Sequence, residues 1–100
     1  MNQFSEQAEV DSSGFIRELG ELGFTEVLTR DWAPNQFVDT HTHPFDVRAL
    51  VLRGEVALSC DGRSQTYRSG DVFTLDAGRA HTEQYGPAGA NFLVGRKYPG

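Results

Sequence analysis

The sequence predicts an all-β domain, an antiparallel sandwich or barrel, with one short helix before it. Strand-like runs of β-branched and apolar residues recur about every ten residues from Phe24 onward. Glycine-containing turns separate these runs, and Asp61-Gly62 is the clearest hairpin signal among them. A helical period of apolar residues occurs once, near the N-terminus. Short strands with regular turns and no second helix are typical of sandwiches and jelly rolls.

Composition narrows the possible functions of the chain. One hundred residues form one domain with a single core. A net charge of −5 argues against general nucleic-acid binding, which requires a basic surface. The single cysteine, Cys60, allows no internal disulfide and fits a reducing compartment. No apolar run approaches the roughly 20 residues that span a bilayer, and the N-terminus lacks the regions of a signal peptide. We therefore expect a cytoplasmic protein without membrane or nucleic-acid partners.

The first predicted element is a helix between residue 12 and residue 22. Its apolar residues share one helical face and are Phe15, Ile16, Leu19 and Leu22. Gly23 follows where a C-terminal glycine would end the helix. We expect this helix to cover the core from outside. Residues 1–11 are polar and are predicted to be a loose N-terminal segment, with a single domain over residues 12–100.

The predicted barrel extends over about residues 24–98. Its strand-like runs are, in order, residues 27–29, 37–43, 50–52, 56–60, 65–67, 72–75, 81–85 and 91–94. Turns between them contain Pro34-Asn35, Gly54, Asp61-Gly62, Gly70-Asp71, Gly78 and Gly86-Pro87. The chain contains no internal repeat or low-complexity linker that would divide this series.

Three histidines are placed so that they can converge. His41 and His43 stand two apart, which puts both side chains on one face of an extended strand, with Cα atoms roughly 6.5–7 Å apart. His81 follows the Gly78 turn and arrives from a separate strand, which barrel closure would bring alongside. We expect these three residues to hold one divalent transition metal; ligand type does not distinguish Fe, Zn, Ni, Mn or Cu. The alternative is a metal-free barrel whose histidines hydrogen-bond within a polar pocket.

The spacing of these histidines and glycines resembles the two motifs of small single-domain cupins. In the first motif, His41 and His43 match the His-x-His pair and Gly54 matches the closing glycine. In the second motif, Gly70, Gly78 and His81 match in register. The resemblance covers roughly residues 34–95 and implies a double-stranded β-helix, or jelly-roll barrel. It also implies a homodimer, because small cupins are often dimers.

The chain departs from the cupin pattern at the carboxylate ligand. The position that a glutamate usually occupies, four residues after the second histidine, is Val47. Asp46 is adjacent, but strand alternation turns it to the opposite face. Glu83 has the parity of His81 and Asp39 has the parity of His41, so either could be a fourth ligand or could orient an imidazole.

Two functions from different classes remain open. Three histidine ligands leave coordination positions free, which is the arrangement of catalytic metal sites. The chain is then a metalloenzyme acting on a small anionic or enolisable molecule, with dioxygenase-like chemistry as one form and Glu83 and Tyr85 as catalytic candidates. Alternatively, it is a non-catalytic module that binds or senses a small molecule. Arg79, close to His81 in sequence, is the cation we expect beside an anionic ligand.

The homodimer has its own argument from the sequence. Leu50 and Leu52 are predicted to lie on the face away from the histidines. Apolar residues outside a small barrel need covering, either by the helix or by a second subunit.

Overall fold

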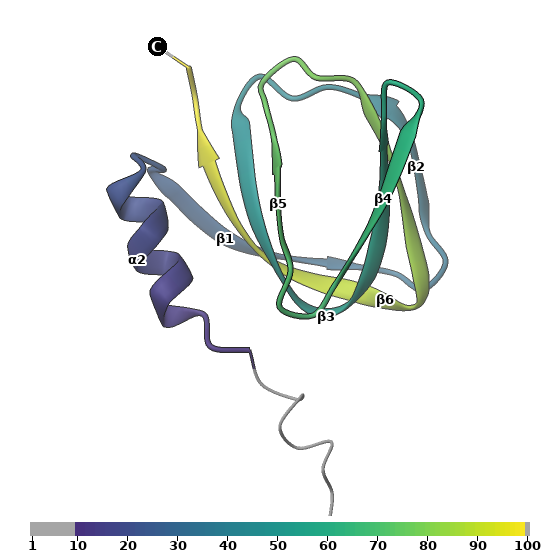
Figure 1. Ribbon diagram of the computed structural model, residues 1–100, viewed down its shortest axis with the longest axis horizontal. Coiled ribbons are helices and arrows are strands. Elements are labelled where there is room, and N and C mark those ends of the chain that lie inside the picture. Colours follow the sequence, from purple (N-terminus) through teal and green to yellow (C-terminus); the bar gives the residue numbers. More distant parts are fainter. Residues whose placement is uncertain (1–9, 100) are drawn as a thin grey trace, which may run out of the picture.

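The computed structural model describes residues 10–99, which form a barrel of strands with one helix outside it (Figure 1). The helix is α2 (Ser13–Glu21), and the strands are β1 (Glu26–Trp32), β2 (Phe37–His41), β3 (Asp46–Cys60), β4 (Arg63–Arg68), β5 (Val72–Leu75) and β6 (His81–Lys97). The predicted all-β fold with a short N-terminal helix is confirmed. The expected loose segment, residues 1–11, falls almost entirely outside the described residues.

The six strands form one sheet that curves round on itself, and the two long strands, β3 and β6, run through both halves of it. The N-terminal half of β3 pairs with β5 and with the C-terminal half of β6, which also pairs with β1. The C-terminal half of β3 pairs with β4 and with the N-terminal half of β6, which also pairs with β2. All these pairings are antiparallel, and together they enclose one interior, as a jelly-roll barrel does.

Glycines lie where the long strands bend between the two halves of the sheet. The β3–β6 register shifts between Gly54 and Val56, which marks a bulge at the bend. Gly54 has φ of 78° and Gly89 has φ of 71°, a conformation that favours glycine. A Cβ on Gly54 would overlap the carbonyl oxygen of Gly89. The glycine of the first motif is therefore required by close backbone contact between the two strands.

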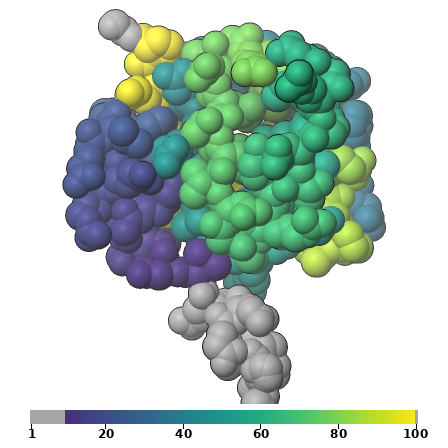
Figure 2. Space-filling view, viewed as in Figure 1, coloured from purple at the N-terminus to yellow at the C-terminus, as the bar shows by residue number. Residues whose placement is uncertain are grey.

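Helix α2 covers the outer face of the sheet that contains β1. Phe15 and Leu19 pack against Leu50 of β3 and Leu93 of β6, and the helix forms a continuous surface with the barrel (Figure 2). The prediction that Leu50 and Leu52 face outward agrees with this packing. Because the helix supplies the cover, these residues no longer argue for a second subunit. Within residues 10–99, no helix combines the length and apolar character needed to cross a membrane.

The barrel interior is apolar and separate from the packing under the helix. Its buried side chains are Val47, Ala49, Val51, Val56, Leu58, Phe73, Leu75, Tyr85, Ala90, Phe92 and Val94. Two polar residues are buried as well, His81 and Glu83. Buried ionisable groups of this kind need partners inside the protein, and the partners of these two define the site.

Candidate metal centre

The structure brings the three histidines together. His41 ends β2, His43 lies in the loop that follows, and His81 begins β6. Strands β2 and β6 pair directly at His41 and His81. One ligand atom from each of the three residues lies within 4.8 Å of the others, and the ring centroids of His41 and His81 are 4.2 Å apart. Two segments separated by about forty residues in sequence thus meet, as barrel closure predicts.

Two hydrogen bonds tie the loop that carries His43 to the turn that precedes His81. The amide of Gly78 donates to the carbonyl of His43 at 2.8 Å. The amide of Ala77 donates to Oδ1 of Asp46, also at 2.8 Å. Asp46 therefore serves as a brace between the two motifs, which is consistent with its predicted orientation away from the histidines. These two hydrogen bonds, one to a backbone carbonyl and one to a side chain, hold the segment that contains His43 and Asp46 against the turn before His81.

Backbone carbonyls orient two of the imidazoles. Nδ1 of His41 lies 2.8 Å from the carbonyl oxygen of Asp39, and Nδ1 of His81 lies 3.0 Å from that of Arg79. A carbonyl oxygen only accepts hydrogen bonds, so Nδ1 must donate in both rings. Nε2 of both rings faces Oε2 of Glu83, which also only accepts, so without an ion a proton lies between an imidazole and the carboxylate. A metal ion would take the place of that proton and bind the Nε2 lone pair. Such an arrangement is the usual one around metal-bound histidine.

Glu83 joins the histidine cluster. It is 7% exposed, and its Oε2 lies 3.1 Å from Nε2 of His41 and 3.2 Å from Nε2 of His81. Two ligands on one ion with bonds of about 2.1 Å are separated by roughly 3.0–3.4 Å. The three histidines form the group whose ligand atoms all lie within 4.8 Å of one another and could hold a divalent transition metal, and Glu83 lies at ligand spacing from two of them, His41 and His81. The predicted parity of Glu83 with His81 is confirmed.

Asp39 does not lie where strand alternation would put it. The β2–β6 pairing runs from Val38 opposite Glu83 to His41 opposite His81, so β2 contains one extra residue. This bulge reverses the alternation between Val38 and His41. The Asp39 side chain is exposed and its Oδ1 accepts from the amide of Thr40. The predicted shared face of Asp39 and His41 is wrong, and Asp39 contributes its carbonyl instead.

The surroundings of the cluster shift two further ionisable groups. Burial, followed by the proximity of His81 and His41, lowers the pKa of His43 below its ordinary value. Burial, followed by the hydrogen bond to Glu83, raises the pKa of Tyr85 far above its ordinary value. The neutral form of His43, the form that binds metal, is thereby favoured. Tyr85 stays protonated, and its hydroxyl donates to Oε1 of Glu83.

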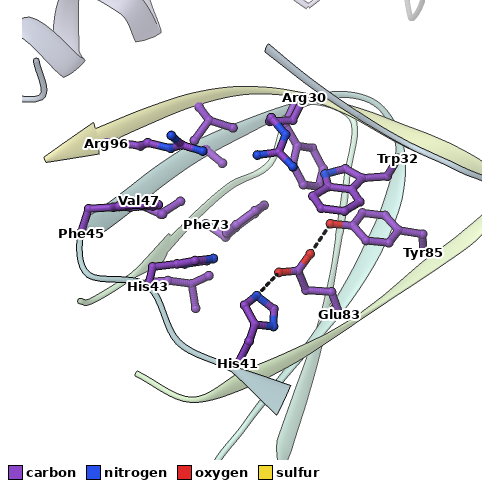
Figure 3. A pocket seen from close by; sticks show the side chains of 14 residues that line it. Arg30, Trp32, His41, His43, Phe45, Val47, Phe73, Glu83, Tyr85 and Arg96 are labelled. Atoms are coloured by element: carbon purple, nitrogen blue, oxygen red, sulfur yellow. Dashed lines mark hydrogen bonds and ion pairs between the residues drawn. The ribbon is translucent and has the colours of Figure 1, made fainter. Parts of the chain in front are cut away.

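The cluster opens onto a cavity of about 160 Å³ in the barrel (Figure 3). Its apolar and aromatic lining consists of Trp32, Phe45, Val47, Ala49, Phe73, Leu75, Tyr85, Phe92 and Val94. Its polar lining consists of His41, His43, Glu83 and two arginines, Arg30 and Arg96. His81 is 2% exposed and stands outside the cavity wall, in contact with Glu83.

The arginines that line the cavity do not include Arg79, the residue that the sequence suggested. Arg79 forms an ion pair with Asp61 at 3.1 Å, away from the cavity lining. Arg30 and Arg96 line the cavity instead. The sequence contained a signal for both. Arg30 alternates with Leu28 and Trp32 on the more buried face of β1, and Arg96 continues the alternation of Phe92 and Val94 on β6.

An antiparallel jelly-roll barrel with a histidine cluster inside, contributed by two glycine-bounded motifs, defines a cupin. Comparison with known proteins agrees with this class. The model of the AraC-like ligand binding domain family matches residues 24–93, and the chain belongs to that family. No functionally curated protein matches the sequence.

Solved structures with the same fold include proteins from three bacteria. A Rhizobium leguminosarum protein of unknown function is 27% identical, with a TM-score of 0.68 over 74% of this chain and 69% of that one. An RmlC-like cupin from Shewanella frigidimarina is 18% identical, with a TM-score of 0.63 over 73% and 65%. A Klebsiella pneumoniae protein with a double-stranded β-helix domain is 23% identical, with a TM-score of 0.61 over 71% and 64%. The alignments thus span slightly less than two thirds of the last two proteins.

Proposed function

We propose that this cupin holds one divalent transition metal with His41, His43 and His81 and binds a small organic molecule beside it. The observation that carries the proposal is the orientation of His41 and His81. Each ring donates from Nδ1 to a backbone carbonyl and presents Nε2 to a shared centre. A neutral imidazole held in this way is a ready metal ligand.

We further propose that Glu83 supplies the carboxylate that position 47 lacks. Val47 lines the cavity but has no donor atom. Oε2 of Glu83 is already within ligand spacing of two imidazole nitrogens. The hydroxyl of Tyr85 holds the other oxygen, Oε1. The carboxylate would thus come from β6, two residues after the last histidine.

The enzymatic form of the proposal is turnover of a small anionic or enolisable substrate. A divalent ion in this set would supply Lewis acidity and open coordination positions. The apolar walls would exclude water, and of the two catalytic candidates, Glu83 and Tyr85, Glu83 is the one available to accept a proton. Because Tyr85 is held protonated, we assign it to positioning Glu83 and not to accepting a proton.

The non-catalytic alternative is supported by the family. Its description is that of a ligand-binding domain, and a barrel cavity can recognise a small molecule without turnover. The two forms share the same metal and cavity, and they differ only in whether a bound molecule is converted.

The experiment begins with metal analysis of the full chain, purified without an affinity tag or chelator. The proposal expects about one transition-metal ion per chain. Oxygen uptake by the metal-loaded protein, screened against small thiols, diketones and hydroxy acids, then separates enzyme from binding module. Protein that neither retains nor takes up zinc, nickel, iron, manganese or copper would contradict both forms.

A homodimer and a cytoplasmic location stay predictions. Strand β1 is at one end of the strand order, and Val27 on it is 44% exposed, which offers an edge for a second copy. Light scattering at tens of micromolar tests the dimer, and a monomeric mass would refute it.

A further inference from the structure

Two arginines reach into the cavity on the side opposite His41 and Glu83. Figure 3 shows Arg30 and Arg96 on one side of the cavity and His41 and Glu83 on the other. Arg30 comes from β1 and Arg96 from the end of β6. The cavity thus has a cationic end in addition to the histidine cluster.

The Arg30 guanidinium lacks a protein partner. Among residues 10–99, its side chain forms no ion pair within 4.0 Å and no hydrogen bond. It is half-buried and lies 4.9 Å from the ring centroid of Trp32, which holds the planar group in place. The guanidinium nitrogens of Arg30 are not among the fully buried donors of the described chain, so they remain accessible from the cavity, where water occupies the place of a counter-ion. An anion in the cavity would replace this water.

Arg96 also lacks a close, buried counter-ion among the described residues. Its guanidinium stacks on Phe45 at 4.6 Å, and its nearest carboxylate is the exposed Glu26, at 3.9 Å. Within the described chain, Nε of Arg96 and Nε1 of Trp32 are buried and have no hydrogen-bond partner. Buried donors without partners are uncommon in native proteins. Both donors belong to residues that line this cavity.

The charge of the lining favours an anion even before a metal binds. Glu83 contributes one negative charge and the two arginines contribute two positive charges, so the lining carries at least about +1 before any proton on the imidazoles is counted. The whole chain carries −5. A positive cavity in an acidic protein concentrates small anions at one place.

We infer that Arg30, assisted by Arg96, binds the carboxylate of a small organic acid whose planar apolar body lies against the aromatic walls. The guanidinium fork matches a carboxylate in two parallel hydrogen bonds. Trp32, Phe45, Phe73, Tyr85 and Phe92 supply flat apolar surface. A cavity of about 160 Å³ is smaller than the roughly 300–1,000 Å³ of pockets for drug-sized ligands, so the acid is small. The inference rests on the proposed function only for the end of the acid that would face the metal. The contact between the carboxylate and Arg30 needs no metal.

The test uses benzoate and its neutral analogue benzamide as probes. Binding is measured by calorimetry on the full chain after chelator treatment. We expect benzoate to bind roughly tenfold or more tightly than benzamide, because a charged hydrogen-bonded pair is lost in the amide. Arg30→Gln should reduce benzoate affinity to that of benzamide. Arg30→Lys keeps the charge without the fork and should give an intermediate ratio.

The matched control is Arg53→Gln, which removes the same charge from an exposed position on β3. It should leave the benzoate-to-benzamide ratio unchanged, and thermal unfolding of each variant shows whether it folds. Equal affinity for both probes, no binding of either, or an unchanged ratio in Arg30→Gln would overturn the inference. Zinc titration of the same samples is independent. Zinc binding without a preference for benzoate over benzamide contradicts only this inference. A preference for benzoate without zinc binding contradicts only the metal proposal.

Discussion

Oε2 of Glu83 lies 3.1 Å from Nε2 of His41, although the two residues come from different strands, β6 and β2. This contact joins the two histidine motifs through a carboxylate that lies outside the position usual for the ligand in the first motif. The usual position, Val47, is apolar and lines the same cavity. The site therefore has the components of a three-histidine, one-carboxylate centre, with the carboxylate on another strand.

Glu83→Gln should weaken zinc affinity by roughly 10–100-fold or more, because a charged ligand is replaced by a neutral amide. Titration calorimetry measures the effect. The matched control is Asp39→Asn, which neutralises an exposed carboxylate close to His41 and should leave affinity unchanged. Equal losses in the two variants would mean that only the general charge near the site matters.

Val47→Glu should restore most of the lost affinity when it is introduced into the Glu83→Gln protein. The side chain at position 47 points into the same cavity as His41 and His43, so a carboxylate there can approach the ion. The same titration checks this double variant. If affinity does not recover, position 47 faces the cavity without reaching the metal.

Tyr85→Phe should lower both stability and metal affinity. The phenol donates to Oε1 of Glu83, and removing it leaves a buried carboxylate oxygen without a partner, at a cost of about 1–3 kcal/mol. Glu83 also loses its orientation, so zinc affinity should fall by roughly 10–100-fold. Chemical denaturation and zinc titration measure the two effects.

Tyr67→Phe is the matched control for that variant. Tyr67 is half-buried, packs against Phe73, and its hydroxyl makes no hydrogen bond to the described residues. The Tyr67→Phe protein should keep the free energy of unfolding and the free energy of zinc binding of the wild type within about 0.5 kcal/mol. A Tyr85→Phe protein with wild-type zinc affinity would show that Glu83 needs no support from the phenol.

Gly54→Ala should be far more destabilising than Gly62→Ala. Both glycines have positive φ, 78° and 77°, which costs alanine about 1–2 kcal/mol. Around Gly62 an added Cβ meets nothing within 4 Å, whereas at Gly54 it overlaps the backbone of Gly89. We expect about 1–2 kcal/mol for Gly62→Ala and more than about 4 kcal/mol for Gly54→Ala. Similar losses in denaturant titrations would mean that the strands can separate at the bend.

Much of this architecture could be predicted from the sequence because it depends on local patterns. Turn glycines, strand periodicity and the helical stripe indicated the barrel and its outer helix, and the spacing of His41, His43 and His81 indicated the cluster. Asp39 could not be placed, because the bulge before His41 is a property of strand pairing and not of either strand alone. Arg30 and Arg96 were missed for a related reason. An arginine among apolar neighbours is usually solvated at its tip, and only barrel closure shows that these two tips share a cavity.

The central claim is that the three histidines jointly hold one transition-metal ion, and the most direct measurement is zinc stoichiometry by calorimetry on the chelator-treated full chain. The wild type should bind about one ion, and His41→Ala, His43→Ala and His81→Ala should each lose more affinity than the roughly 10–100-fold that a supporting hydrogen-bond partner is worth. Asp39→Asn should bind as the wild type does. Stoichiometric zinc binding of wild-type strength in any single histidine variant would contradict the three-histidine site.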